Sequence, residues 1–379
     1  MSCMNASNPD RQVDVCVRGA GAVGGSLALA LSRQGLRVVL QQGPAHGHGP
    51  DVRAYALNAA SVSLLRSLRV WDALPADAVT PVHDMKVEGD AAPGALSFSA
   101  WEQSVEALAW IVDAAALEEA LDAALRFAPH VRRVGLDQPV DAPLTALCEG
   151  KHSATRQRLG IDFDLHWYGQ RAIAARLVAD RPHHGTARQW FRSPDILALL
   201  PFERPQAGAS YGLVWSLPEA RAAEMMAFDA AAFEQALNEA TGGAAGRLVL
   251  GSDRAAWPLG LGRASRFSGP GWVLLGDSAH VVHPLAGQGL NLGLADVQAL
   301  VETLSSREPW RGLGDERLLA RYARRRLGPT TAMATVTDGL LHLFAPPTPW
   351  LRELRNRGLS LVDHLPGAKR WLAGRALGL

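Results

Sequence analysis

Residues 13–24 read VDVCVRGAGAVG, which places a glycine-rich turn directly after a short apolar run. Apolar residues accumulate in Val13–Arg18, as they do in a buried parallel strand. A stretch with helical spacing of its apolar residues follows over residues 24–34, and Gly35 ends it. Arg37–Leu40 then has the character of a second strand. The start of the chain is therefore predicted to form a βαβ unit.

The turn has the pattern G-x-G-x-x-G, in which each glycine has its own task. Gly19 allows the tight turn, Gly21 lets the backbone approach a pyrophosphate, and Gly24 lets the helix pack closely on the strand. The start of the helix offers free N–H groups and the positive end of its dipole to the phosphate. A glycine-rich turn kept for packing alone is the alternative, but the position between a strand and a helix favours dinucleotide binding.

The second strand departs from the dinucleotide pattern at its end. The pattern expects an acidic residue there to bond the adenosine ribose, and counting from Gly35 that position is Gln42. Because a charged hydrogen bond is worth about 1.5–3 kcal/mol and a neutral one about 0.5–1.5 kcal/mol, the expected loss is about 1 kcal/mol. Arg18, just before the turn, either reaches a phosphate or faces solvent at the end of the strand.

A second glycine-rich stretch occupies residues 276–293, with the sequence GDSAH followed after three residues by PLAGQGLNLG. An acid directly after the apolar strand Trp272–Leu275, here Asp277, suits a sugar or ribityl hydroxyl. The helix start beyond the turn places N–H groups where negative charge gathers on a reduced flavin. Gly287 and Gly289 permit close approach of the backbone. The candidate cofactor-binding residues here are Asp277, Gly287, Gln288, Gly289, Leu290 and Asn291, and the candidates at the reacting centre are Pro284, Gly287 and Gly289.

Two histidines of this stretch, His280 and His283, have the spacing of metal ligands on a turn. No acid or cysteine partner is evident beside them, and a flavin loop already accounts for the segment. We therefore expect no metal. A pyrophosphate turn together with a flavin loop indicates FAD rather than FMN as the cofactor.

The remaining sequence predicts helices and short strands in an order that interrupts the cofactor domain. Helical stretches are expected at 58–68, 114–127, 230–240 and 290–304, and in most of the chain from 317 onward. Short strands are expected at 82–87, 95–98, 168–178, 213–217 and 272–275.

The cofactor segments lie far apart in the chain, which implies a discontinuous domain. The predicted fold class is α/β: a discontinuous Rossmann-like FAD-binding domain with a β-sheet substrate domain inserted and a C-terminal helical tail. The predicted boundaries are 12–75, 100–160 and 251–330 for the FAD-binding domain, 76–99 and 161–250 for the β-rich substrate domain, and 331–379 for the C-terminal helices.

Composition is that of an ordinary globular protein. Hydrophobic residues make up 48% and charged residues 20%, and a formal net charge of +1 gives no reason to expect nucleic acid as a partner. Cys3, Cys16 and Cys148 are far apart and are expected to be reduced thiols. With no signal-peptide pattern and no apolar run of about 18 residues, we expect a cytoplasmic protein.

The last thirty residues alternate basic and apolar side chains, for example Arg352, Leu354, Arg355, Lys369 and Trp371. A basic amphipathic tail docks on a membrane surface or on a protein partner, which would make the protein peripheral to the inner face of a membrane. A helix pair that covers the FAD-binding domain is the alternative. The sequence leaves both open.

With both motifs placed, the chain resembles the ubiquinone-biosynthesis hydroxylases, which are polyprenylphenol monooxygenases of the class A FAD-dependent aromatic hydroxylases. The likeness runs from about Val13 to Leu377 and includes DVRA at residues 51–54, YGQ at 168–170 and LVDHLP at 361–366. It implies that NAD(P)H reduces FAD, that reduced FAD takes up O₂ as a C4a-hydroperoxide, and that an electron-rich phenol is hydroxylated. The implied substrate is an aromatic or lipid-tailed quinone precursor, and quinone-biosynthesis proteins are possible partners.

The resemblance also suggests residues outside the two glycine-rich stretches. Arg53 matches an arginine that lies over the cofactor phosphates in the family, and a plain surface arginine is the alternative. The candidates for the substrate side of the sheet are Tyr168, Gln170, Trp190 and Phe191, although aromatic residues in a sheet more often belong to a core.

Several positions depart from the family pattern. The usual alanine-aspartate-glycine reads Cys148-Glu149-Gly150 here, and Ala114 and Ala115 stand where asparagine and arginine are frequent. The segment 131–147 is also short and lacks a full β-hairpin. These departures, with Gln42, suggest a second hypothesis, a non-catalytic scaffold or substrate-binding subunit that has lost FAD. A flavin reductase or halogenase on the same fold is a third.

Overall fold

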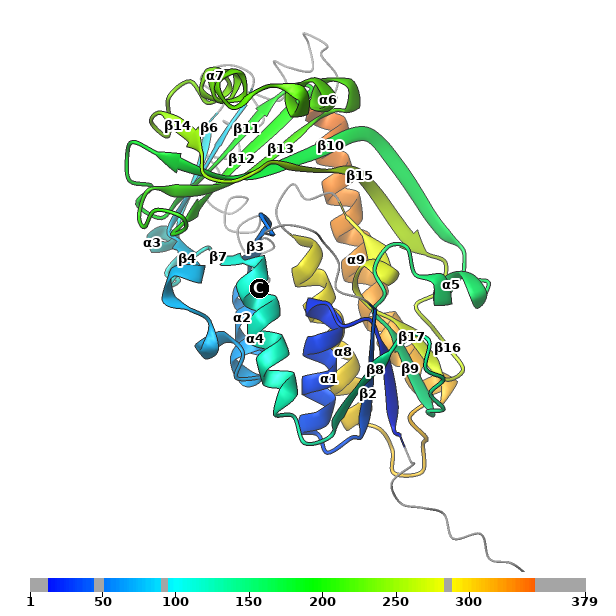
Figure 1. Cartoon of the computed structure of the whole chain (residues 1–379). Helices are drawn as coiled ribbons and strands as arrows, with labels where there is room; N and C mark the ends of the chain where they lie inside the picture. Colours follow the sequence, from blue (N-terminus) through cyan, green and yellow to red (C-terminus); the bar gives the residue numbers. More distant parts are fainter. Residues whose placement is uncertain (1–12, 44–50, 90–94, 283–287, 345–379) are drawn as a thin grey trace, which may run out of the picture.

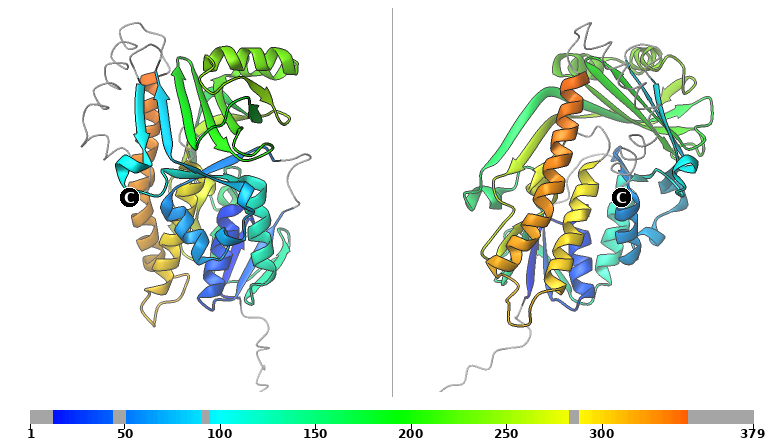
Figure 2. Two further views of the ribbon diagram at one scale, coloured as in Figure 1. Left: turned by 90° about the vertical axis from the view of Figure 1, so that its left-hand side faces the viewer. Right: turned by 180° about the vertical axis from the view of Figure 1, so that it is seen from behind.

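The computed structural model describes residues 13–43, 51–89, 95–282 and 288–344. An α/β layer lies below a broad, mostly antiparallel sheet, and a long helix runs along the side of both (Figures 1 and 2). The predicted α/β fold class, with its interrupted cofactor layer, is confirmed. The C-terminal tail beyond residue 344, for which the sequence predicts basic amphipathic helices, lies outside the described residues.

The predicted βαβ unit is present at the centre of the lower layer. β1 (Val15–Arg18) leads through α1 (Ala22–Arg33) to β2 (Val38–Gln42), and the two strands pair in parallel. β1 is enclosed because β2 lies on one side and β9 on the other. The six-stranded sheet has the order β16-β17-β9-β1-β2-β8, with β8 at Val131–Gly135, β9 at Leu144–Leu147, β16 at Ser268–Gly269 and β17 at Trp272–Leu274.

The strands β8 and β9 do not form a hairpin with each other. β8 pairs in parallel with β2, and β9 pairs in parallel with β1, so the short link between them crosses two strands of the sheet. β9 delivers the segment 148–156 to the carboxyl ends of the parallel strands. This is the edge at which open α/β sheets bind their ligands.

Besides α1, four helices of the described residues share the core of this sheet. Asn58 and Asp113 cap two of them by accepting hydrogen bonds from Ser61 N (2.9 Å) and Ala116 N (3.1 Å). The predicted helices at 58–68, 114–127 and 290–304 are confirmed, and their ends differ from the prediction by at most two residues. The helices are α2 (Ala59–Ser67), α4 (Ala114–Arg126), α8 (Gln288–Ser305) and α9 (Glu316–Phe344).

The upper layer is a nine-stranded sheet built around the long strand β10 (Phe163–Ala179). Residues alternate between its two faces, so Ile173, Ala175 and Leu177 pack with α6 and α7 on the outer face. The strands are β5 (Asp84–Glu88), β6 (Ala95–Ser99), β11 (Thr186–Arg192), β12 (Asp195–Phe202), β13 (Ser210–Pro218), β14 (Leu248–Leu250), β15 (Ala255–Ala264) and β18 (His280–Val281), and the outer helices are α6 (Glu219–Ala227) and α7 (Ala230–Thr241).

A small antiparallel sheet lies between the two layers, in the order β3-β7-β4. Its strands are β3 (Ala54–Leu57), β4 (Val79–Val82) and β7 (Ala109–Asp113). One face packs into the lower core and the other meets the nine-stranded sheet in a separate apolar cluster. Two short helices connect strands: α3 (Ala100–Gln103) follows β6, and α5 (Ala154–Arg158) precedes β10.

The predicted domain boundaries remain a prediction. Hydrogen bonding places β15 in the nine-stranded sheet and β4 in the small sheet, although the sequence-based boundaries put β15 with the FAD-binding domain and β4 with the substrate domain. α9 likewise runs without a break across the boundary at residue 331.

Candidate active site

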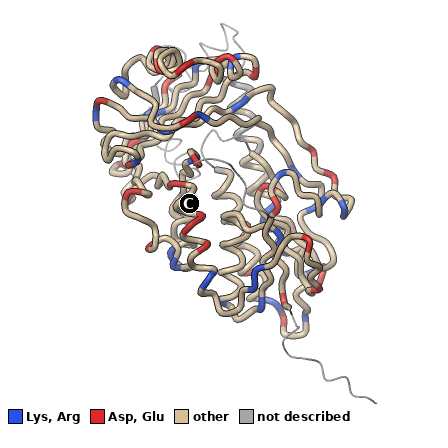
Figure 3. The backbone as a smooth tube through the Cα atoms, in the orientation of Figure 1, with Lys and Arg blue, Asp and Glu red and all other residues tan. Residues whose placement is uncertain are grey.

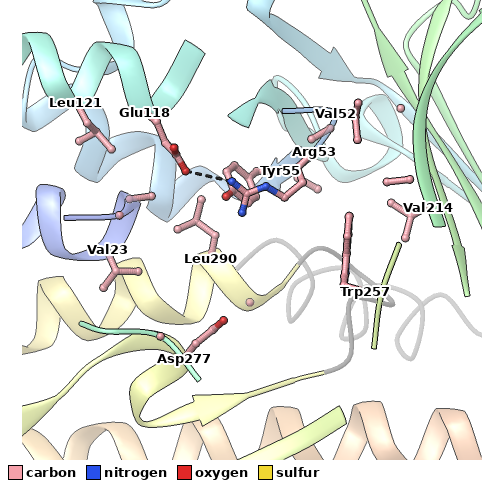
Figure 4. Close-up of a pocket in the computed structure, with 18 of the residues that line it drawn as sticks. Val23, Val52, Arg53, Tyr55, Glu118, Leu121, Val214, Trp257, Asp277 and Leu290 are labelled. Carbon is pink, nitrogen blue, oxygen red and sulfur yellow. Dashed lines mark hydrogen bonds and ion pairs between the residues drawn. The ribbon is translucent and has the colours of Figure 1, made fainter. Parts of the chain in front are cut away.

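A cavity of about 1430 Å³ separates the lower layer from the nine-stranded sheet. It is larger than the roughly 300–1,000 Å³ of a typical small-molecule pocket, which leaves room for a cofactor and a substrate together. The first turn, the end of β2, β3, α4 and the start of α8 line it from below. β10–β13 and β15 line it from above (Figure 4).

The first glycine turn lies at the floor of the cavity. Gly19 has φ +104°, and a Cβ there would lie 2.3 Å from the carbonyl oxygen of Cys148. A Cβ on Gly24 would lie 1.9 Å from the carbonyl oxygen of Gly19. A Cβ on Gly21 would meet nothing within 4 Å, and Gly21 lines the cavity. The turn therefore presents a bare backbone and the start of α1 to open space, which fits a pyrophosphate.

The two neighbouring glutamines at the end of β2 have different surroundings. Gln42 is exposed and lines the cavity, as its predicted ribose-binding role requires. Gln41 is fully buried, and its Nε2 donates to the carbonyl oxygen of Gln138 (2.5 Å). Its Oε1 accepts from Arg18 Nη1 (2.6 Å). Arg18 is thus held inside the protein rather than facing solvent.

The second partner of Arg18 is Glu149, at 2.9 Å from Nε. Glu149 also accepts from Ser153 Oγ (2.5 Å) and from the backbone and side chain of Thr155 (3.1 and 2.8 Å). Burial acts to raise the pKa of Glu149, but the hydrogen bonds from Ser153, Arg18 and Thr155 together hold it below its ordinary value. Glu149, which is one methylene longer than the aspartate usual in the family, therefore has hydrogen-bond partners for both carboxylate oxygens. These partners could not be predicted from the sequence.

Arg53 extends across the cavity toward α4 (Figure 4). Its guanidinium pairs with Asp51 (2.6 Å) and with Glu118 (3.3 Å), and it lies over the ring of Tyr55 at 5.8 Å. The hydrogen bonds that Arg53 donates to Asp51 raise the pKa of Arg53, so it stays charged. A cation at this position lines the cavity, which is compatible with the predicted contact to cofactor phosphates.

Acidic residues of α4 line the same wall, and α4 carries several red segments in Figure 3. Two of them pair with cations: Glu118 pairs with Arg53, and Asp122 pairs with Arg126 (2.7 Å) and Arg133 (2.5 Å). At the start of the helix, Ala114 is fully buried against the core, so no side chain there reaches the cavity.

Asp277 faces the cavity from the turn after β17 (Figure 4). Its carboxylate is open to the cavity space, although protein surrounds that space on most sides. This surrounding protein raises the pKa of Asp277, and the charges of His280, Lys151 and Arg53 only partly oppose the effect. The carboxylate accepts no hydrogen bond from the described residues and has the cavity in front of it, which fits the hydroxyls of a cofactor.

This turn is held in place by a buried carboxylate that was not predicted from the sequence. Asp296 of α8 is fully buried and accepts from Gly276 N (2.8 Å), His280 Nε2 (2.7 Å) and Arg326 Nε (2.5 Å). Burial acts to raise the pKa of Asp296, but His280 and Arg326 hold it below its ordinary value. The network joins the turn before Asp277 to α8 and α9. The only sequence signal was an acid in an otherwise apolar helical stretch.

The start of α8 borders the cavity through Gly289 and Leu290. A Cβ on Gly289 would meet nothing within 4 Å. Asn291 is buried and turned toward the small sheet, where its side chain accepts from Ser61 Oγ (2.7 Å) and donates to Ala56 O (2.7 Å). Pro284, Gly287 and His283 lie outside the described residues, and Gln288 is described only as the first residue of α8.

The four residues suggested for the substrate side do not line the cavity. Trp190 is buried in the outer-face core and donates to Glu88 (2.8 Å). Phe191 and Tyr168 belong to an apolar cluster near β5 and β6, and Gln170 donates to Pro194 O (3.4 Å). Their assignment as substrate residues stays a prediction that the cavity does not support. Sheet residues that do line it include Gln189, Ala198, Val214 and Trp257.

Comparison with known proteins places this site in a family. Residues 12–109 and 118–337 match the family described as "FAD binding domain". The chain is 31% identical to the 3-demethoxyubiquinol 3-hydroxylase of Escherichia coli, over 98% of this chain and 100% of that protein. The chain belongs to the ubiquinone-biosynthesis hydroxylase family of FAD-dependent monooxygenases.

Other members and structures of this class agree with the assignment. The chain is 30% identical to the ubiquinone hydroxylase UbiL of Rhodospirillum rubrum, over 97% of this chain and 90% of that protein. The crystal structure of PqsL from Pseudomonas aeruginosa has the same fold, with a TM-score of 0.74 and 21% identity over 92% of this chain and 100% of that one. The predicted family, enzyme class and FAD cofactor are confirmed, and the scaffold hypothesis gains no support from these relatives.

Two general properties of the described residues bear on the site. No group of three or more His, Cys, Asp or Glu side chains in the described part of the chain is arranged to hold a metal ion. Among the helices that the structure describes, none combines the length and apolar character needed to cross a membrane.

Proposed function

We propose that the protein hydroxylates an electron-rich phenolic ring, with O₂ as the oxygen source and NAD(P)H as the transient electron donor. The ring is that of a polyprenylated quinone precursor, as the names of the relatives suggest for those proteins. The single observation that carries the proposal is the cavity, which has cofactor-type turns on its floor and a mostly apolar sheet face as its roof.

The residues present fit FAD at three places. The bare turn at Gly21 and the start of α1 suit the pyrophosphate, and Gln42 at the end of β2 suits the ribose. Asp277 suits the ribityl hydroxyls, because it faces the cavity from the turn before α8. Arg53 supplies a fixed positive charge on the same side. Bound FAD would accept electrons from NAD(P)H and activate O₂ beside the ring.

The protein must also hold the phenolic ring in position and exclude water from the cavity. Trp257 and Val214 close the roof above the cofactor loops (Figure 4), and the floor at Leu290 is apolar. Oxygen transfer to carbon competes with release of hydrogen peroxide, so a ring that is poorly placed diverts electrons to peroxide.

The direct test uses the purified protein with bound FAD. NAD(P)H consumption, hydrogen peroxide and hydroxylated product are measured with 2-farnesylphenol and without it. The proposal expects visible flavin absorption, faster NAD(P)H oxidation when the phenol is present, and a hydroxylated product. A protein that carries FAD but neither oxidises NAD(P)H nor hydroxylates a phenol would be a scaffold instead.

Gly289→Leu sharpens the test, because this position borders the cavity and has free space in front of it. A leucine there projects toward the ring or the substrate and leaves the contact of Asp277 alone. The variant should keep its FAD while hydroxylation collapses and hydrogen peroxide rises. Gly312→Leu is the matched control, since this loop glycine also has free space but does not line the cavity.

A further inference from the structure

Arg53, the cation that lines the cavity beside α4, is held at its backbone as well as at its side chain. The side chain pairs with Asp51 and Glu118. The carbonyl oxygen accepts two hydrogen bonds, from Ala114 N (3.2 Å) and from Arg176 Nη2 (2.6 Å). The second donor is a charged group, and hydrogen bonds from charged groups are shorter and stronger than neutral ones. Arg176 therefore bears directly on the position of Arg53.

Arg176 comes from the opposite layer of the molecule. It belongs to β10 of the nine-stranded sheet, whereas Arg53 directly precedes β3 of the small sheet. Ala175 and Leu177 face the outer core with α6 and α7, so Arg176 between them faces inward, toward the small sheet. Only 6% of Arg176 is exposed. Its contact with Arg53 therefore joins the roof of the cavity to the side on which the cofactor turns lie.

The guanidinium group of Arg176 is held in a defined plane. It lies over the ring of the fully buried Phe202, at 3.9 Å from the ring centre. Gly212 pairs with Arg176 in the neighbouring strand β13, and a Cβ there would lie 3.3 Å from the Cβ of Ala54. The absence of a side chain at Gly212 thus lets the two sheets come close together, which brings Arg176 within reach of the carbonyl oxygen of Arg53.

The same nitrogen of Arg176 also reaches the start of α4. Nη2 lies 3.4 Å from Oδ2 of Asp113, whose other carboxylate oxygen caps the helix by accepting from Ala116 N. This helix carries Glu118, the second carboxylate that pairs with Arg53. Burial lowers the pKa of Arg176 and Asp113 opposes the effect, but a guanidinium group stays charged in proteins. Arg176 thus contacts both segments that hold the cavity cation.

The contacts of Arg176 favour positioning over plain stabilisation. A buried charge is costly to the fold unless its ion pair is close and its hydrogen bonds are complete. Here the ion pair with Asp113 is 3.4 Å long, and among the described residues Nη1 has no hydrogen-bond partner. The short contact is the one with the carbonyl oxygen of Arg53. The charge is therefore best placed to fix the backbone of that residue.

We propose that Arg176 is a positioning residue, which fixes the backbone of Arg53 and so holds the guanidinium group of Arg53 where it meets the cofactor phosphates. The proposal rests on the proposed function to the extent that Arg53 contacts FAD. It goes beyond that function because Arg176 does not line the cavity and acts on the cofactor only through another residue.

The test is a double-mutant cycle on FAD binding, without NAD(P)H and without a phenol. Dissociation constants are measured by titrating FAD into the FAD-free wild type, Arg53→Met, Arg176→Met and the double variant. Arg53→Met should weaken FAD binding at least about tenfold, because a charged contact is lost. Arg176→Met should weaken it at least about fivefold when Arg53 is present, but less than about twofold in the Arg53→Met background. The second loss is small because the side chain that Arg176 positions is already gone.

Two further variants keep the result decisive. Arg204→Met is the matched control, since Arg204 also lies near Asp113 (3.8 Å) but donates its hydrogen bonds to Asp77. It should change FAD affinity less than about twofold. Arg176→Lys keeps a cation beside Asp113 without the planar fork of a guanidinium, and it replaces Arg176→Met if that variant does not fold. Its loss should be smaller and again depend on Arg53. Thermal unfolding of each FAD-free variant shows whether it is folded.

The outcomes separate this proposal from the proposed function. If the Arg176 variants leave FAD affinity unchanged, or weaken it by the same factor with and without Arg53, Arg176 does not act through Arg53. If Arg53→Met alone leaves the affinity unchanged, the positioning role falls together with the phosphate contact. Coupling between the two arginines in a protein that hydroxylates no phenol would overturn the proposed function alone. Hydroxylation of a phenol by a protein without this coupling would overturn the positioning role alone.

Discussion

The two glycine-rich turns that line the cavity show that glycines in one motif serve different ends. In the first turn, the protein itself requires Gly19 and Gly24, because a Cβ would lie 2.3 Å from Cys148 O or 1.9 Å from Gly19 O. Gly21 between them has no neighbour within 4 Å. Packing within the protein therefore explains why Gly19 and Gly24 are glycines, whereas Gly21 is explained only by the close approach of a ligand.

The second turn repeats the division with different contacts. Gly276 and Gly293 both face Val23, where a Cβ would approach Cγ2 to 3.2 and 2.5 Å. Val23 belongs to α1, so these two glycines join the pyrophosphate turn to the flavin turn. Gly289 has free space in front of it. In both turns, the glycine with free space borders the cavity, so Gly21 and Gly289 are the positions where we expect a cofactor or substrate to approach.

The largest effect should come from a glycine that the fold requires. Gly24→Ala places a Cβ against a backbone oxygen that has no room to move, since the helix and the strand are both packed. We expect a loss of about 3 kcal/mol or more, at the upper end of the range for overpacking. For a chain of this size the melting temperature should fall by about 4 °C or more. A thermal melt of the FAD-free protein measures it, and an unchanged melting temperature would contradict the packing argument.

The next effect should separate binding from folding. Gly21→Val adds a side chain where the protein has free space but the pyrophosphate is expected. The FAD-free protein should melt within about 2 °C of the wild type, because the fold does not need this glycine. FAD affinity should fall at least about 100-fold, or about 2.7 kcal/mol. Equilibrium titration with FAD measures the loss, and full FAD occupancy would count against a pyrophosphate at this turn.

A third substitution tests the flavin turn through its acid. Asp277→Ala should weaken FAD binding by about 1.5–3 kcal/mol if the carboxylate bonds a cofactor hydroxyl. Asp277→Asn keeps a neutral acceptor and should lose less, which serves as the matched control. Within the described residues the side chain of Asp277 makes no hydrogen bond, so the stability of the FAD-free protein should not fall. Equal loss of stability in both variants would indicate a structural role instead.

The sequence was sufficient where local pattern determines structure. The βαβ unit and the helices expected at 58–68, 114–127 and 290–304 follow from periodicity and from residues a few positions apart. Asp277 and Gln42 also line the cavity as expected, since both follow a strand whose end is fixed by its apolar run. The ligand-binding edge of a parallel sheet can therefore be located from the sequence.

Pairing between distant segments could not be derived in this way. Arg18 and Glu149 are 131 residues apart, and their contact depends on β9 lying beside β1. The four suggested substrate residues show a second limit. Trp190 and Phe191 are neighbours in one strand and so face opposite sides, and sequence alone does not tell which side is the cavity.

The Arg18–Glu149 pair gives a prediction that depends on pH. The pKa of Glu149 is lowered in the folded protein, so its charge stabilises the fold above the ordinary glutamate pKa of about 4.3. This stabilisation is lost as the pH falls through the lowered pKa. Glu149→Gln should cost about 1–2 kcal/mol at pH 7, because neutral hydrogen bonds replace charged ones. Melting curves of both proteins between pH 7 and pH 3 should converge on the acid side, and a constant gap would contradict the pairing.

The smallest expected effect compares the two neighbouring glutamines at the end of β2. Gln42 is exposed and borders the cavity, so Gln42→Glu should give the ribose a charged acceptor and raise FAD affinity by up to about tenfold, or about 1 kcal/mol. Gln41→Glu is the matched control. It replaces the Nε2 group that donates to Gln138 O, and sets a carboxylate against that carbonyl oxygen in a fully buried position. The control should lower the melting temperature without raising FAD affinity. If Gln42→Glu leaves the affinity unchanged or weaker, the ribose is held by another group, and the motif's acidic position has lost its role in this protein.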